Sequence, residues 1–333
     1  MKTIKHIVIA GSSGGHILPA LAYINNLSVM KDPNTILFIT NEIGKKYLGK
    51  IESNKINKII LKSKNKFFFI LNLLLKVSFV FLSNRRIILI GFGGFITTPV
   101  LIISKLFNIF FLSFNKIYIH EQNVIYGLAN KINYFIAKNV FISFPKNNMR
   151  RKEIFVGNFF INRNKFREKL DHNFINVLLI GGSAGSLDLN NMMLKEINNI
   201  NNSYLKNTKF FIQIPASHIE VLKKKYIDLV DNNNCEFFSF KDDLNPQEYD
   251  IILSRSGSGS INEILYFTND VFFIPHLISR DQHQRFNLDY FLSHNMSLSK
   301  FSIPLKKKKV NNYYFNSLIN PHSIEKIICY TTR

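Results

Sequence analysis

The chain has 333 residues, of which 46% are hydrophobic and 20% charged, so it is no peptide or disordered tail and is long enough for about two domains. Its 43 Lys and Arg residues outnumber 22 Asp and Glu residues, and the formal net charge of +21 favours an anionic partner: nucleic acid, acidic lipid or a phosphorylated substrate. Abundant Asn, Lys, Ile and Phe are also what an AT-rich genome encodes, so charge alone does not identify the anion. The two cysteines, Cys235 and Cys329, lack metal-ligand spacing, and we predict a reducing compartment and no disulfide.

A short apolar strand is predicted just before the first glycine-rich loop, Gly11-Ser12-Ser13-Gly14-Gly15-His16, and a helix after it. Backbone N–H groups and a helix N-terminus make such a loop a candidate phosphate cradle, although a purely structural turn has the same pattern. The spacing is neither that of a Walker loop nor G-x-G-x-x-G. His16 at the positive end of a helix tends to stay neutral, which makes it a candidate general base; a structural, hydrogen-bonding histidine is the alternative.

An apolar helix is predicted over residues 67–83, interrupted by the polar residues Asn72, Lys76 and Ser83. The run is too short to favour a membrane span. Basic residues flank it on both sides, as in a helix that lies on anionic lipid with its apolar face inserted. A buried core helix is the alternative, and the sequence leaves both open.

Further buried strands are predicted at 35–40, 86–91 and 116–120, and a second series of strand, glycine-rich turn and helix begins at 175. Their continuous apolar runs are typical of parallel strands that helices cover on both faces. The polar stretch 162–173 is the best linker candidate. We therefore predict an α/β protein with a doubly wound parallel sheet in each half and a boundary near residue 160.

The second half contains two more loops with the chemistry of a nucleotide site. The first runs from Gly181 to Ser186, where Ser183 adds a hydroxyl to the backbone donors. The second begins at Ser254 and leads into a helix. In this segment the guanidinium of Arg255 can donate two hydrogen bonds to a phosphate, and Glu263 can accept hydrogen bonds from ribose hydroxyls. The alternative for this second loop is a capping box formed by Ser260 and Glu263.

Two polar clusters follow strands where sugar hydroxyls could be bound: His120-Glu121-Gln122-Asn123, and Asp281-Gln282-His283-Gln284 with Asn287. Adjacent residues at a strand end point to opposite sides, so His120 and Glu121 make a poor metal site. We predict no metal.

Taken in order, these segments resemble one family, the MurG glycosyltransferases of the GT-B fold. GSSGGHILPALA is similar to the family's GGTGGHxxPALA, GFGGFITTP to GxGGYxSxP, HEQNVIYGLANK to HEQNxxxGxxNK, and VGN to VGNP. In the second half GGSAGSLDLN resembles GGSQGAxxLN, SRSGSGSINEI resembles CRSGAxTxxEI, and DQHQRFN resembles DxHQxxNA. No single motif is decisive, but the whole series in family order is specific.

The resemblance implies two Rossmann-like domains facing a central cleft. Residues 1–160 would form the acceptor-binding, membrane-associating domain, with the tail at about 318–333 a candidate to pack back on it; residues 161–317 would bind the UDP-sugar. The implied reaction is inverting, metal-independent transfer of N-acetylglucosamine from UDP-N-acetylglucosamine to the muramyl 4-hydroxyl of undecaprenyl-linked lipid I, which yields lipid II. It needs no cofactor and takes place at the cytoplasmic face of the cell membrane, on an anionic surface, with no nucleic acid partner.

The resemblance also implies site residues. The catalytic candidates are His16 and Glu121, and the resemblance does not choose between them. The implied donor-binding residues are Asn123, Gly182, Ser183, Gly185, Arg255, Ser260, Glu263, His283 and Gln284. The implied acceptor-diphosphate residues are Ser13, Gly14, Gly15, His16, Gly93 and Gly94.

This sequence departs from the family pattern at several positions. Ile161 stands where the family carries an Arg shortly after VGNP, which would lower donor affinity, and Ala184 replaces a Gln. Two other functions remain: another GT-B transferase that uses a UDP-sugar and a glycolipid acceptor, and a non-catalytic binder of anionic surfaces. The sequence contains no nucleic-acid-binding signature that would support the non-catalytic binder.

Overall fold

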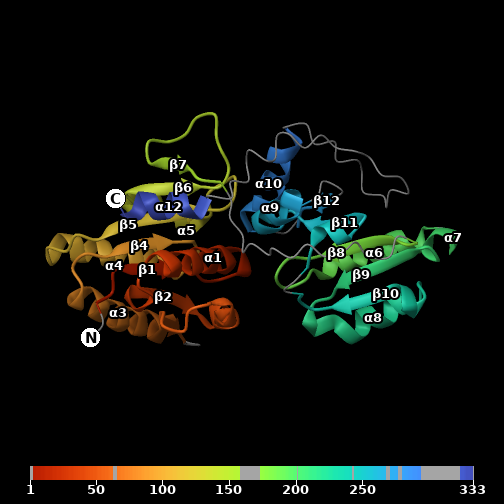
Figure 1. Cartoon of the computed structure of the whole chain (residues 1–333), viewed down its shortest axis with the longest axis horizontal. Coiled ribbons are helices and arrows are strands. Elements are labelled where there is room, and N and C mark those ends of the chain that lie inside the picture. The colour runs from red at the N-terminus through yellow and green to blue at the C-terminus, as the bar shows by residue number, and fades with distance from the viewer. Residues whose placement is uncertain are drawn as a thin grey trace. The chain divides into compact units, whose positions relative to one another are not determined.

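The computed structural model describes residues 3–62, 66–157, 173–200, 202–241, 244–267, 271–276, 280–293 and 323–332. The chain divides into two compact units: unit 1 contains residues 1–161 and 318–333, and unit 2 contains residues 162–317 (Figure 1). Each unit is a parallel β-sheet with helices packed on it, as the continuous apolar strands predict.

Unit 1 contains a sheet of order β3-β2-β1-β4-β5-β6-β7, in which every described pairing is parallel. Its strands are β1 (His6–Ile9), β2 (Ile36–Asn41), β3 (Asn57–Leu61), β4 (Ile88–Gly91), β5 (Lys116–Glu121), β6 (Asn139–Ile142) and β7 (Glu153–Phe155). Its helices are α1 (Gly14–Met30), α2 (Glu42–Lys45), α3 (Lys66–Ser83), α4 (Thr97–Phe110), α5 (Leu128–Ile136) and α12 (Ser323–Thr332).

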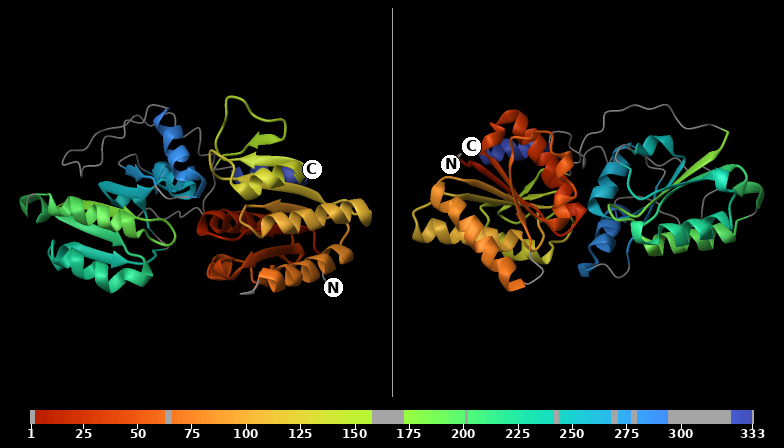
Figure 2. Two further views of the ribbon diagram at one scale, coloured as in Figure 1. Left: turned by 180° about the vertical axis from the view of Figure 1, so that it is seen from behind. Right: turned by 90° about the horizontal axis from the view of Figure 1, so that it is seen from below.

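Two hydrophobic clusters cover the two faces of this sheet. Helices α3, α4 and α5 pack in a row, α3 on α4 and α4 on α5, over one face, and α1 and α12 lie over the other (Figure 2). Side chains alternate along β5: Ile117 and Ile119 belong to the cluster on the α3–α5 side, and Tyr118 to the cluster on the α1 side.

The C-terminal helix α12 belongs to unit 1. Ile324, Ile327 and Ile328 are buried in the same cluster as α1. The Tyr23 and Thr331 hydroxyls lie 3.5 Å apart, and Lys326 donates to the carbonyl of Phe155 at 2.8 Å. The end of the chain therefore completes the first unit rather than the second.

Helix α3 has a buried side and an exposed side. Leu73, Val77 and Phe81 are buried in the core, whereas Leu75 and Phe79 are 65% and 59% exposed. The helix is thus partly a core helix, as one of the two interpretations of 67–83 expected, and its outer side is apolar, as the other expected. Among the described residues, no helix has both the length and the apolar character needed to cross a bilayer.

Unit 2 contains a smaller sheet of order β10-β9-β8-β11-β12, again with parallel pairings throughout its described strands. Its strands are β8 (Ile175–Ile180), β9 (Thr208–Gln213), β10 (Cys235–Phe238), β11 (Ile251–Arg255) and β12 (Val271–Ile274). Its helices are α6 (Leu187–Asn198), α7 (Asn202–Leu205), α8 (Ile219–Ile227), α9 (Ser258–Phe267) and α10 (His283–Leu292).

Both sheets reverse their strand order at one place, between β1 and β4 in unit 1 and between β8 and β11 in unit 2. In open parallel sheets, ligands bind at such a switch point, beyond the carboxyl ends of the strands, where neighbouring loops leave in opposite directions. The loops after these four strands are the glycine-rich segments of the sequence.

Candidate functional site

In unit 1, the loops after β1 and β4 lie against each other. The Phe95 N–H donates to Oγ of Ser12 at 3.2 Å, and a Cβ on Gly94 would come within 2.4 Å of the Gly11 carbonyl oxygen. Gly93 and Gly94 both have positive φ, +96° and +84°, which glycine adopts without strain. The predicted acceptor residues of the two loops are therefore brought together at the switch point.

His16 lies in the first turn of α1 and is held by this pair of loops. A Cβ on Gly93 would lie 2.9 Å from both Cε1 and Nδ1 of His16, so the imidazole rests directly against the backbone of the second loop. The side chain is half-buried, whereas Ser13 and Gly15 beside it are exposed. His16 thus combines a restricted position with access to a ligand.

His120 and Glu121 are the last two residues of β5, which runs one residue beyond the predicted strand at 116–120. As adjacent residues of a strand they point to opposite faces of the sheet. His120 packs on the Phe92 ring, and its Nε2 lies 3.2 Å from the Ser143 hydroxyl. Burial, with the charge of His16 as a smaller cause, lowers the pKa of His120 to about 3. His120 is therefore a neutral neighbour of His16 near pH 7.

The Glu121 carboxylate is enclosed by its own loop. One oxygen accepts from the backbone and side-chain nitrogens of Asn123, at 3.0 and 3.2 Å, and the other from Gly127 N–H and the Asn130 amide, at 3.1 and 3.0 Å. Burial raises its pKa, and these four hydrogen bonds oppose the rise. The side chain orders residues 121–130, and with them Asn123.

In unit 2, the loop after β8 has the form of an amide-lined turn. Gly182 and Gly185 have φ of +84° and +74°, and a Cβ on Gly181 would lie 2.2 Å from the backbone nitrogen of Ser186. Ser183 at its tip is exposed. The loop leads into α6, whose positive end faces the same side of the sheet. It can hold an anion by backbone donors.

Two side chains that sequence reasoning missed hold this loop in place. Gln213, the last residue of β9, accepts from Gly181 N–H at 2.8 Å and donates to the Gly182 carbonyl at 2.8 Å. Ser186 caps α6 by accepting from Leu189 N–H at 3.3 Å. The cap is visible in the sequence as Ser before the helix, but nothing local marks Gln213, which is a partner only because β9 is next to β8.

Arg255 ends β11, is only 5% exposed and donates to protein acceptors in every direction. Nε and Nη2 reach Oγ of Ser186 at 3.0 and 2.8 Å, and Nη2 also reaches Asp188 Oδ2 at 3.0 Å. Nη1 donates to the carbonyls of Ile274 and Pro275 at 3.3 and 3.1 Å. The guanidinium therefore joins the β8 loop to the end of β12.

The polar cluster that begins at Asp281 is tied to the loop after β11. The hydroxyl of Ser256 donates to the Gln284 carbonyl at 2.8 Å, and the Gln284 side-chain oxygen accepts from His276 N–H at 2.9 Å. These bonds bring the start of α10, including His283, to the switch point of unit 2. His276 Nε2 also lies 3.1 Å from Asp188, a residue that the sequence interpretation did not select.

The capping-box alternative for Ser260 and Glu263 is wrong. Helix α9 begins at Ser258, so Ser260 already lies inside its first turn and cannot serve as the residue before the helix. Both side chains are half-buried on α9. Ile161, where the family pattern has Arg, lies outside the described residues.

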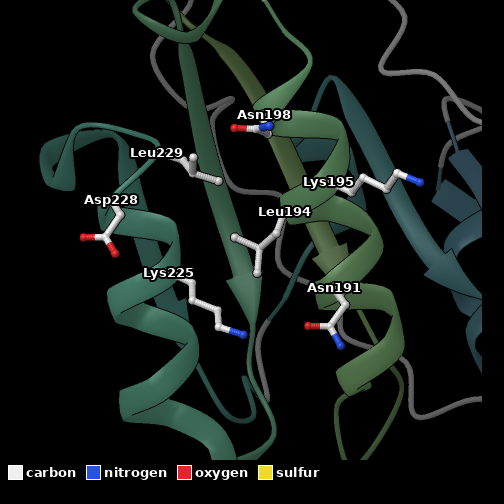
Figure 3. Close-up of a pocket in the computed structure, with 7 residues that line it drawn as sticks. All are labelled: Asn191, Leu194, Lys195, Asn198, Lys225, Asp228 and Leu229. Atoms are coloured by element: carbon white, nitrogen blue, oxygen red, sulfur yellow. The ribbon is translucent and has the colours of Figure 1, made fainter.

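Elsewhere the described residues offer little competing chemistry. No three His, Cys, Asp or Glu side chains in the described part of the chain gather so that they could hold a metal ion. A groove of about 460 Å³ lies between α6 and α8, lined by Asn191, Leu194, Lys195, Asn198, Lys225, Asp228 and Leu229 (Figure 3). None of the predicted site residues lines it.

Family models match both units of the chain. Residues 6–142 match the glycosyltransferase family 28 N-terminal domain, and residues 176–323 match the glycosyltransferase family 28 C-terminal domain. The chain is thus a two-domain glycosyltransferase of the GT-B fold.

Its relatives narrow the class. A UDP-N-acetylglucosamine–N-acetylmuramyl-(pentapeptide) pyrophosphoryl-undecaprenol N-acetylglucosamine transferase of Wolbachia sp. subsp. Drosophila simulans is 27% identical over 325 residues, 96% of this chain and 91% of that protein. The transferase of the same name from Pelagibacter ubique is 28% identical, over 95% of this chain and 88% of its own. The crystal structure of Acinetobacter baumannii MurG is similar with a TM-score of 0.64 at 22% identity, covering 98% of this chain and 94% of that one. The chain belongs to the MurG family of glycosyltransferase family 28.

Proposed function

We propose that this chain transfers N-acetylglucosamine from UDP-N-acetylglucosamine to the muramyl 4-hydroxyl of lipid I, with inversion and without a metal ion. The observation that carries the proposal is the placement of two amide-lined loops, one at the switch point of each sheet, in a chain that matches family 28 over both units. The names of the relatives support the choice of both substrates.

The donor is proposed to bind to unit 2. Gly182, Ser183 and Gly185 would hold its diphosphate at the start of α6, where backbone N–H groups and the helix dipole stabilise negative charge on the departing UDP. Loss of one such preorganised donor typically costs about 10²–10³ in rate. The remaining donor residues would bind the nucleoside and the sugar: Ser260, Glu263, His283 and Gln284 from unit 2, and Asn123 from unit 1.

We propose that Arg255 serves the donor indirectly. All of its donor directions are occupied by protein acceptors, so a phosphate would have to displace Ser186, Asp188 or a backbone carbonyl. Its role would be to keep the β8 loop in the shape that presents the amides. This differs from the direct phosphate contact that the residue type suggests.

The acceptor is proposed to bind to unit 1, with its diphosphate on Ser13, Gly14, Gly15, Gly93 and Gly94. His16 would take the proton from the 4-hydroxyl while that oxygen attacks the anomeric carbon, the bond to UDP breaks and the configuration inverts. His16 is favoured over Glu121 because it is half-exposed, whereas both oxygens of Glu121 are buried and already held by two donors each.

The α3–α5 layer is proposed to bring unit 1 to the cytoplasmic face of an anionic membrane. It exposes large apolar side chains over all three helices: Leu71, Leu74, Leu75, Phe79 and Leu82 on α3, Ile102, Leu106, Ile109 and Phe110 on α4, and Leu128, Ile132 and Phe135 on α5. An exposed apolar face of this extent marks an interaction surface, and a lipid-linked acceptor makes a bilayer the fitting partner.

The proposal is tested by measuring transfer of labelled N-acetylglucosamine to a lipid I analogue, in the presence and absence of EDTA. We expect turnover that EDTA does not change. His16→Ala should lower kcat by about 10²–10⁴, whereas Glu263→Ala should mainly raise the KM for the donor.

Tyr204→Ala, an exposed position on α7, is the control and should behave as wild type. A folded wild-type protein that transfers nothing, or that uses UDP-galactose better than UDP-N-acetylglucosamine, would overturn the assignment. Wild-type kinetics in both site variants would overturn the residues but not the reaction.

A further inference from the structure

Phe95 is an exposed aromatic residue at the edge of the diphosphate cradle, the name used here for the loops after β1 and β4 to which the acceptor diphosphate is proposed to bind. It directly follows the two positive-φ glycines Gly93 and Gly94, and its backbone N–H is bound to Ser12 in the first loop. Its ring is nevertheless 56% exposed. The backbone of Phe95 is therefore fixed by the two loops while its side chain remains available to a ligand.

The Phe95 ring also contacts the apolar helical layer. It lies 5.2 Å, centroid to centroid, from the ring of Phe69 at an interplanar angle of 43°. Phe69 is in the first turn of α3, is 9% exposed and belongs to the core. From that turn onward α3 exposes Leu71, Leu74 and Leu75. Phe95 thus lies where the polar cradle meets the apolar side of α3.

A lipid-linked sugar diphosphate has two different groups on its two phosphates. One phosphate carries the sugar, and the other carries, through a single oxygen, the first isoprene unit of the lipid. When the diphosphate lies on the cradle, that isoprene unit is the apolar group that must lie within a few bonds of it. A phenyl ring supported by a second ring is a fitting apolar contact for it.

We infer that Phe95, backed by Phe69, binds the first isoprene unit of the acceptor and so orients the diphosphate with its lipid toward α3 and its sugar away from it. The inference rests on the proposed function, because it assumes a lipid-linked diphosphate acceptor. It makes Phe95 a specificity-determining residue that distinguishes lipid-linked from non-lipid sugar diphosphates.

The test uses two water-soluble acceptors with the same diphospho-muramyl-pentapeptide head, one with a two-isoprene tail and the other with a methyl group. Neither requires a membrane, so the α3–α5 layer does not enter the result. For Phe95→Ala we expect kcat/KM to fall about tenfold with the isoprenyl acceptor, the effect of losing contact with roughly 50 Å² of apolar surface. With the methyl acceptor, and for the donor KM, we expect changes of less than about twofold.

Phe95→Leu, which keeps an apolar side chain, should retain most of the activity of wild type toward the isoprenyl acceptor. Tyr204→Ala is the matched control, an aromatic residue of similar exposure, 46%, in unit 2. Equal losses with both acceptors would overturn the inference in favour of a contact with the muramyl sugar, and no loss with either would overturn it outright. If wild type used neither acceptor, the proposed function would fail, and this inference with it.

Discussion

At the scale of single residues, chemical type and actual role separate most clearly at Arg255 and Glu121. Both have the charge of a ligand-binding residue, and both are buried and fully engaged by protein groups. A buried charge is stable only when its hydrogen bonds are satisfied, so at each position the fold has supplied a full set of partners. Side chains that remain accessible, such as Ser183 and His16, are better candidates for direct contact.

Arg255→Gln should lower the free energy of unfolding by about 2–3 kcal/mol, because it leaves the carbonyls of Ile274 and Pro275 without their donors. Urea denaturation measures this change. Arg285→Gln is the matched control: its guanidinium is 69% exposed and lies 3.8 Å from Asp289, and the expected change is below about 0.5 kcal/mol. Equal effects of the two substitutions would show that Arg255 does not stabilise the fold by joining the β8 loop to the end of β12.

His6 predicts a pH dependence of stability. It is 6% exposed in β1, and burial, with Lys31 and Lys5 as smaller causes, lowers its pKa to about 4. As the pH is lowered, His6 of the unfolded chain takes up a proton near pH 6.5, whereas His6 of the folded chain does so only near pH 4. The contribution of His6 to the free energy of unfolding is therefore complete above pH 6.5. It falls by about 1.4 kcal/mol for each pH unit as the pH is lowered from 6.5 to about 4.

Urea denaturation of wild type and His6→Phe at pH 7, 6 and 5 tests this pH dependence. In the variant, the free energy of unfolding should change less steeply with pH, because the proton that His6 takes up on unfolding no longer contributes. The buried His120 still contributes to the pH dependence in both proteins. The same slope in both proteins would show that His6 is not the group responsible, whatever the absolute stabilities.

At the scale of elements, the strand–loop–helix units of the sequence are confirmed, and their contacts are the new information. The loops after β1 and β4 are about 80 residues apart in the chain, yet they touch because β4 lies next to β1. The local pattern predicts each loop but not which two loops meet. β5 also runs one residue beyond the predicted strand at 116–120, so Glu121 belongs to the strand.

Gly93→Ala should disturb His16 through the loop contact. The added Cβ would lie 2.9 Å from the imidazole, at a residue with φ of +96°. We expect kcat to fall about 10- to 100-fold, because small misplacements of a reacting group are costly, with donor affinity within about twofold of wild type. Gly49→Ala, where an added Cβ meets nothing within 4 Å, is the control. Unchanged turnover in Gly93→Ala would argue against His16 as the base.

At the scale of the whole molecule, the two units differ in their surfaces. Unit 1 carries the exposed apolar layer of α3, α4 and α5, and α12 returns to complete the opposite face of the same sheet. Among the described residues of unit 2, the exposed large apolar side chains are scattered, as are Val221 and Ile227 on α8. If a bilayer is the partner, unit 1 is the part that should bind it.

Leu75→Glu combined with Phe79→Glu should weaken binding to vesicles that contain anionic lipid by at least about 100-fold, since two apolar insertions are replaced by charges. Co-sedimentation with the vesicles measures the binding, and turnover with a water-soluble acceptor should persist. Val221→Glu combined with Ile227→Glu, on α8, is the control. Vesicle binding that both double variants retain would exclude the α3–α5 layer as the membrane surface.

The sequence by itself determined the class of fold and the family. Continuous apolar strands each followed by a glycine-rich turn are a local signal, because burial on both sheet faces and positive φ each restrict the residue types in a short window. The tertiary structure alone decided which polar groups are free for a substrate. Ser186 and Arg255 are 69 residues apart, and Gly93 meets His16 across the switch point. Such partners depend on strand order, a long-range property that no local pattern encodes.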